Sequence, residues 1–218
     1  MGRVLIPRQE GERDEGLLVV LSGPSGVGKG SVVARAMTTR AEGAARLRRS
    51  VSATTRPPRA DEIEGRDYFF RSPEGFQRMV QQGELLEWAA YLDHSYGTPQ
   101  GWVDRQLGAG YDVVLEIEVQ GAMQVRQRRP EAVLIYMLPP SWAALQRRLK
   151  KRRSESEELQ HRRLEVARQE MAHIRNYDYV IVNDRVASAA RALLAILAAE
   201  HARVSRGGWE RKLGDMNG

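Results

Sequence analysis

The segment with the clearest chemical potential is glycine-rich and lies near the start of the chain. It contains the spacing G-x-x-x-x-G-K between an apolar run at residues 17–22 and an amphipathic pattern that begins near Lys29. Glycines let successive backbone N–H groups turn inward around phosphate oxygens, the following helix presents its positive end, and the lysine supplies a point charge. The place of this spacing between a predicted strand and a predicted helix favours a phosphate-binding loop over an ordinary turn. The predicted loop consists of Gly23, Pro24, Ser25, Gly26, Val27, Gly28, Lys29, Gly30 and Ser31.

Gly30 departs from the usual form of such a loop. A Ser or Thr that ligates Mg²⁺ normally stands at this position, and Ser31, one residue later, carries the nearest hydroxyl. The Gly-Lys-Gly sequence resembles that of some nucleoside monophosphate kinases, so the variant points toward that group of enzymes. We expect Mg²⁺ as a cofactor, with Ser31 and the downstream Glu118 as candidate ligands.

Motifs further along the chain resemble the guanylate kinase family in order and spacing, from about residue 16 to residue 204. The resemblance implies an enzyme that uses ATP to phosphorylate GMP to GDP in purine nucleotide metabolism, with ATP and GMP as its substrates. The motifs that carry it are S-V-S-A-T-T-R-P-P-R at 50–59, G-R-D-Y-F-F at 65–70, L-E-W-A at 86–89, Y-G-T at 96–98, L-E-I-E-V-Q-G at 115–121, L-P-P-S at 138–141 and V-N-D at 182–184.

The resemblance implies a guanine pocket in which Glu87 supplies a carboxylate and Ser52 and Thr98 supply hydroxyls. Guanine presents N1–H and N2–H donors beside an O6 acceptor. A selective pocket therefore needs a carboxylate facing the donors and a hydroxyl or amide facing O6. A buried pocket of this kind rejects a base that leaves the polar groups of the pocket unpaired.

The phosphate group of GMP has its own predicted clamp. Arg56, Arg59, Tyr68 and Tyr96 match the family positions that hold this dianion. Two guanidinium forks and two phenols can bind the phosphate and orient the oxygen that attacks.

Glu116 and Glu118 form an acidic pair near the end of a predicted strand. The family commonly carries an aspartate at the second of these positions, so Glu118 is one methylene longer than expected. At i and i+2 both carboxylates would project from one face of the strand toward the ligand-binding edge of the sheet. One would serve Mg²⁺ and the other GMP, and the sequence leaves that assignment open.

On the donor side, the arginine-rich stretch at 147–155 resembles the lid of these kinases, and Arg152 and Arg163 match its catalytic arginines. Together with Lys29 and Arg56, they would stabilise charge on the transferring phosphoryl group. Asn183 matches a position near the adenine of ATP. We interpret the other arginines of this region as a solvated helix face: Arg147, Arg148, Arg153 and Arg162.

Strand and helix patterns alternate along most of the chain, which predicts an α/β fold with a P-loop core, a mostly parallel sheet and flanking helices. Strands are predicted at 17–22, 67–71, 113–117, 133–138 and 179–183, and helices from 29 with Val32, Val33, Ala36 and Met37 inward, and at 73–82, 120–129, 141–151, 155–176 and 186–204. The predicted organisation is a flexible extension at 1–15, a core at 16–49 and 101–204, an inserted GMP-binding lobe at about 50–100, an arginine-rich helical lid at about 147–165, and a tail at 205–218.

The composition excludes several functional classes. The 218 residues suit one large domain or a core with an inserted lobe, and no cysteine is present. A disulfide scaffold, a cysteine nucleophile and a thiolate zinc site are therefore excluded. The sequence has no apolar run near the roughly 20 residues of a membrane span. We expect no membrane partner and a cytoplasmic location.

Two other functions compete with the kinase. A non-catalytic guanylate kinase-like module would use the same lobe to hold peptides, but such relatives typically lose the phosphate loop or the arginines that this chain keeps. A nucleic-acid-binding function would rest only on the net charge of +6 and the arginine clusters. We expect no nucleic-acid partner, because phosphorylated substrates explain the same charge. A monomer and a homo-oligomer both remain open.

Overall fold

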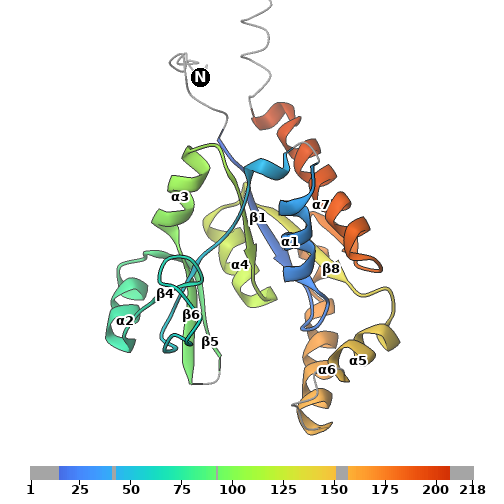
Figure 1. The fold of residues 1–218 in the computed structure, drawn as a ribbon, viewed down its shortest axis with the longest axis horizontal. Helices are drawn as coiled ribbons and strands as arrows, with labels where there is room; N and C mark the ends of the chain where they lie inside the picture. Colours follow the sequence, from blue (N-terminus) through green and yellow to red (C-terminus); the bar gives the residue numbers. More distant parts are fainter. Residues whose placement is uncertain (1–14, 41–42, 92, 151–156, 207–218) are drawn as a thin grey trace, which may run out of the picture.

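Five parallel strands form the central sheet of the computed structural model, which describes residues 15–40, 43–91, 93–150 and 157–206 (Figure 1). The strand order is β2-β7-β1-β8-β9, and every neighbouring pair is parallel. The bounds are β1 Leu18–Ser22, β2 Leu47–Arg49, β7 Asp112–Glu116, β8 Val133–Leu138 and β9 Tyr179–Val182. β1 lies at the centre, so the loop that follows it is placed in the middle of the sheet's carboxyl edge, where ligands bind in open α/β sheets.

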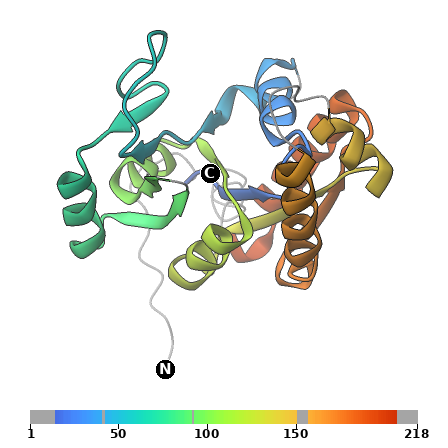
Figure 2. The same cartoon turned by 90° about the horizontal axis from the view of Figure 1, so that it is seen from below.

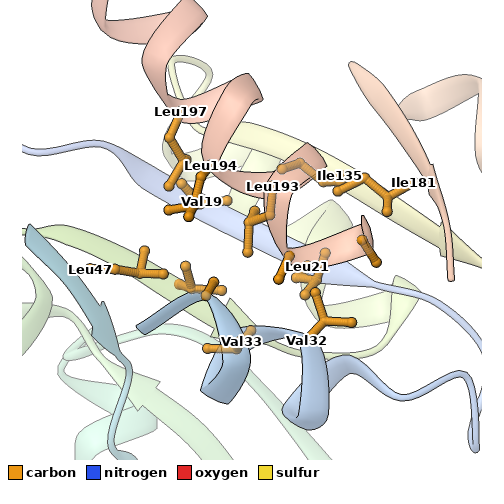
Figure 3. Close-up of a cluster of buried hydrophobic side chains, with 14 of the residues drawn as sticks. Val19, Leu21, Val32, Val33, Leu47, Ile135, Ile181, Leu193, Leu194 and Leu197 are labelled. Carbon is orange, nitrogen blue, oxygen red and sulfur yellow. The ribbon is translucent and has the colours of Figure 1, made fainter. Parts of the chain in front are cut away.

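Helices cover both faces of this sheet. On one face α1 (Lys29–Thr38) and α7 (Val186–His201) pack on Val19 and Leu21, and on the other face α3 (Gln100–Gly108) and α4 (Val119–Arg128) pack on Leu18 and Val20. Figure 3 shows the first of these clusters, with leucines of α7 above the sheet and valines of α1 beside it. Alternate residues of β1 point to opposite faces, so a continuous apolar run is what a strand covered on both sides requires.

A second sheet of four strands stands beside the core (Figure 1). Its order is β4-β3-β6-β5, with β3 and β4 parallel and the other pairs antiparallel. The elements of this lobe are β3 Ser52–Thr54, β4 Tyr68–Phe70, α2 Pro73–Gln81, β5 Leu85–Tyr91 and β6 His94–Pro99. The sequence patterns predicted β4 and α2 but missed β3, β5, β6 and also α3.

Helices α5 (Trp142–Lys150) and α6 (Glu157–Met171) follow β8 and lie on the opposite side of the core from the lobe (Figure 2). Both the lobe and this helix pair extend past the carboxyl end of β1 (Figure 1). Three short 3₁₀ turns complete the described chain: η1 Ala44–Arg46, η2 Ile174–Asn176 and η3 Val204–Arg206. The loop between β1 and α1 is therefore flanked by two arms, which are the lobe on one side and the helix pair α5 and α6 on the other (Figure 1, Figure 2).

The α/β fold with a parallel sheet is confirmed, and three details of the sequence prediction differ from the structure. Met37 is expected to face inward, but in the last turn of α1 it is 38% exposed. The tail was expected from residue 205, but Arg206 is in η3 and pairs with the buried Glu200 at 2.7 Å. The helix predicted to continue to residue 204 ends at His201.

No helix in the described part of the chain has the length and hydropathy of a membrane-spanning segment.

Candidate functional site

The loop between β1 and α1 has the backbone of a phosphate cradle. Gly23, Gly26 and Gly28 all have positive φ angles, of 145°, 83° and 96°, and the N–H of Val27 donates to the carbonyl of Pro24 at 3.0 Å. A side chain at Gly23 would also collide with β8, because its Cβ would stand 2.4 Å from the carbonyl oxygen of Met137. These positions require glycine, and the turn leads directly into the N-terminus of α1, which is suited to an anion.

Lys29 turns back over this loop. Its ammonium donates to the carbonyl of Gly23 in the part-buried interior of the turn. Burial lowers the pKa of Lys29, and three nearby carboxylates oppose that shift: those of Glu170, Glu118 and Glu116. The lysine is therefore a part-buried, desolvated cation near acidic groups on two sides of the site.

Two side chains hold the loop from behind. The amide of Asn183 donates to the carbonyl of Val27 at 2.8 Å, and Arg148 donates to that same oxygen at 3.1 Å and to the carbonyl of Asn183 at 2.9 Å. A Cβ at Gly28 would be 2.8 Å from the Asn183 amide nitrogen, so the loop and Asn183 are packed in contact. The prediction that Arg148 belongs to a solvated helix face is therefore wrong, whereas Arg147 beside it is exposed.

The acidic pair lies at the end of β7. Glu116 forms an ion pair with Arg49 at 2.8 Å, and its side chain is only 11% exposed. Burial raises the pKa of Glu116, and the charges of Arg49 and Lys29 oppose that shift. Glu118 occupies the N-cap position of α4 without a side-chain capping bond, and it is exposed.

The space that a side chain at Gly30 would occupy lies next to Glu116. A Cβ at this position would stand 3.3 Å from a carboxylate oxygen of Glu116, so the space next to the first turn of α1 is taken by an acidic group. Ser31 is exposed on the same turn. Among the described residues, no group of three or more His, Cys, Asp or Glu side chains could by itself hold a metal ion.

Glu87 and Thr98 form a buried pair in the second sheet. The Thr98 hydroxyl donates to Glu87 Oε1 at 2.6 Å, and Glu87 is 5% exposed. Burial raises the pKa of Glu87, while the hydroxyl and the backbone N–H of Thr98 oppose that shift. Ser52 begins β3, which pairs with the strand that carries Thr98, and its side chain is half-buried. Burying a carboxylate in this way lowers the stability of the fold unless a strong partner compensates for the lost solvation. Glu87 is therefore a candidate functional residue.

Three of the four predicted clamp residues come together. The guanidinium of Arg56 lies 5.3 Å from the centre of the Tyr68 ring, and this ring meets Tyr96 edge-on at 6.2 Å. Arg59 is exposed at the end of the same loop. Glu62, which the sequence analysis did not single out, fixes this loop: both of its oxygens accept from Arg56, at 2.6 and 2.9 Å, and one accepts from the Arg59 N–H at 2.8 Å.

Helix α6 brings two charged side chains to the loop between β1 and α1. Arg163 donates to the hydroxyl of Ser25 in the phosphate loop at 3.2 Å, and Glu170 acts electrostatically on Lys29. Arg163, Ala167 and Glu170 share one helix face at spacings of four and three, and Ala167 is 1% exposed. Arg152, the other predicted lid arginine, lies outside the described residues, as does Arg153.

Comparison with known proteins identifies the family. A family model described as Guanylate kinase matches residues 15–200. The chain belongs to the guanylate kinase family. It is 48% identical to the guanylate kinase of Desulfitobacterium hafniense over 195 residues, which cover 89% of this chain and 96% of that one. It is also 48% identical to the guanylate kinase of Streptococcus mutans over 193 residues, covering 88% and 90% of the two chains.

A solved structure agrees with this assignment. The crystal structure of guanylate kinase from Anaplasma phagocytophilum superimposes with a TM-score of 0.69 at 32% identity, covering 93% of this chain and 95% of that one. The chain is therefore an enzyme, a guanylate kinase, which transfers a phosphoryl group from ATP to GMP. Nothing in these similarities supports the non-catalytic module.

Replacing Arg148 by alanine tests its support of the loop. The variant loses two charge-assisted hydrogen bonds, so we expect the free energy of unfolding to fall by about 1.5–3 kcal/mol and the KM for ATP to rise. The exposed neighbour Arg147→Ala is the matched control, with an expected change within about 0.5 kcal/mol. Equal behaviour of the two variants in urea denaturation and ATP titration would contradict this role.

The buried Glu87 should cost stability at neutral pH. Its raised folded pKa means that the folded state binds a proton more readily than the unfolded state, so stability falls as the pH rises from about 4.3 through the raised value. We expect Glu87→Gln to unfold at a higher temperature than the wild type at neutral pH, by about 2–4 °C for each 1 kcal/mol gained in a domain of this size.

The difference in unfolding midpoint should narrow as the pH falls and close below about 4.3, the unfolded pKa, because Glu87 is protonated in both states only there. Thermal unfolding between about pH 4 and pH 8 measures it, with the exposed Glu84→Gln as the control. A Glu87→Gln variant that becomes less stable than the wild type as the pH rises would show that ionised Glu87 stabilises the fold.

Proposed function

We propose that the chain phosphorylates GMP by in-line transfer between the two arms of the structure. The phosphate loop and Lys29 bind the outer phosphates of ATP, and Asn183 contributes to the donor side. Arg163 stabilises the charge that develops on the transferring group, with Arg152 in the same role. The Arg163 contact with Ser25 supports this assignment, since it brings a guanidinium to the loop.

The acceptor side is assigned to the lobe. Glu87 accepts hydrogen bonds from guanine N1–H and N2–H, and Thr98 and Ser52 complete the pocket. Arg56, Arg59, Tyr68 and Tyr96 hold the phosphate of GMP, so that one of its oxygens faces the γ-phosphoryl group. The observation that carries the assignment is the buried Glu87–Thr98 pair, because it supplies an inward carboxylate in a lobe that also carries the phosphate clamp.

The residues around Lys29 suit Mg²⁺. This hard cation takes oxygen ligands and usually keeps several waters, binding through one or two carboxylates together with the phosphates of the substrate. Glu116 and Glu118 supply such carboxylates next to Lys29 and the loop, and Ser31 is the nearest hydroxyl. When bound, the ion neutralises charge on the outer phosphates of ATP. Glu116 already has Arg49 as a partner, so the exposed Glu118 is the better candidate ligand.

We also propose that the reaction serves purine nucleotide metabolism in the cytoplasm. Support comes from the substrates of the family and from the lack of cysteine, which suits a reducing compartment. ATP and GMP are the proposed partners. The positive net charge of the protein suits the phosphate groups of these two substrates, so no nucleic-acid partner is proposed.

Release of ADP in a coupled assay tests the assignment of residues. The protein is supplied with ATP, Mg²⁺ and one of GMP, AMP, CMP or UMP. We expect turnover with GMP only, a loss of at least about 100-fold in kcat for Lys29→Ala, and a similar loss in kcat/KM for GMP in Glu87→Gln. The exposed Lys150→Ala is the control for charge. Full activity of Glu87→Gln would remove Glu87 from the pocket, and preference for AMP would overturn the account of the base.

A further inference from the structure

The strand that carries Glu87 lies at the edge of the second sheet. β5 pairs with β6 on one side only, and their register shifts between Leu85, which faces Pro99, and Trp88, which faces Gly97. Glu87 lies inside this irregular segment. Such irregularities redirect side chains and interrupt the regular hydrogen bonds of the sheet. Pairing with β6 alone therefore leaves the position of Glu87 weakly determined.

Helix α4 covers the open side of this segment. The carboxamide of Gln124 accepts from the Trp88 N–H at 3.1 Å and donates to the Trp88 carbonyl at 2.9 Å. The N–H and C=O of one strand residue point to the same side, so this single side chain pairs with Trp88 as a neighbouring strand would. Arg128, four residues further along α4, donates to the carbonyl of Leu85. Both residues that flank the irregular segment are thus held by the helix.

Gly121 completes the contact. A Cβ at this position would stand 2.8 Å from Glu87 Oε2, so the carboxylate lies directly against the bare first turn of α4. Gly121, Gln124 and Arg128 are spaced by three and four residues and share one helix face. This helix face contacts β5 at three places: the carbonyl of Leu85, the carboxylate of Glu87 and the backbone of Trp88.

We propose that Gln124 is a positioning residue for base selection. It fixes the backbone of Trp88, and with it the adjoining Glu87, so that the carboxylate stays between Thr98 and Gly121 in the orientation that recognises guanine. This inference rests on the proposed role of Glu87. Gln124 does not touch the substrate; it acts through Glu87.

Substituting Gln124 by leucine removes both hydrogen bonds and keeps a side chain of similar size. Trp88 is 37% exposed, so water can reach the strand and the fold should persist. We expect the KM for GMP to rise about tenfold, with kcat at saturating GMP and the KM for ATP within about twofold of wild type. The ratio of kcat/KM for GMP to that for IMP, which lacks the 2-amino group, should fall about tenfold.

Gln127→Leu, an exposed position on the same helix, is the matched control and should leave the ratio unchanged. Gln124→Glu is the second variant: it keeps an acceptor for the Trp88 N–H but sets a carboxylate against the Trp88 carbonyl, so the ratio should fall here too. A GMP-to-IMP ratio that stays at the wild-type value in both folded variants overturns the proposal. A general loss of kcat with an unchanged ratio does so as well, because it would mean a purely structural role.

The same assay on Glu87→Gln separates the two possible failures. If this variant loses selectivity while the Gln124 variants keep it, only the positioning role is wrong. If Glu87→Gln also keeps the wild-type ratio, then the proposed guanine pocket itself is wrong, and the role of Gln124 falls with it.

Discussion

The burial of β1 on both faces is the constraint on which the rest of the structure depends. Val19 and Leu21 are covered by α1 and α7, and Leu18 and Val20 by α3 and α4. This burial fixes β1 in the middle of the sheet, and the loop that follows β1 leaves the sheet at its carboxyl edge, which is where the glycine-rich turn is found. The hydrophobic core therefore determines where the proposed phosphate-binding loop lies, between the lobe on one side and helices α5 and α6 on the other (Figure 1, Figure 2).

Two buried charges sit in these surroundings at a cost to stability. Lys29 is desolvated beside the loop, and Glu87 is desolvated in the lobe. Burial therefore lowers the pKa of Lys29 and raises the pKa of Glu87, which favours the neutral form of each. Among the described residues neither group forms an ion pair: the Lys29 ammonium donates to a carbonyl, and the Glu87 carboxylate accepts from a hydroxyl. Groups held in this way are prepared for a charged or polar ligand, and the cost of burial is offset when that ligand binds.

The sequence predicted the core better than the lobe. β1, β8 and the loop between β1 and α1 were recoverable because a buried strand is a continuous apolar run and the turn needs glycines at fixed places. β3 is only three residues long, and β5 contains an irregular register around Glu87, so neither shows a clean alternation. The functions of Arg148 and Glu62 could not be read at all, because their partners are a backbone carbonyl 121 residues away and an arginine in the same loop.

Helix α4 links the proposed metal-binding edge to the proposed guanine pocket. Its N-cap residue is Glu118, beside Lys29, and its first turns carry Gly121 and Gln124, which meet the strand of Glu87. A helix rises about 1.5 Å per residue and is stiff over one or two turns. The separation between Glu118 and the proposed guanine pocket is therefore set within one rigid element rather than across a flexible connection. Side chains of α4 bond to the backbone of β5, so in the proposed arrangement a displacement of β5 along α4 would shift the base relative to the phosphoryl donor.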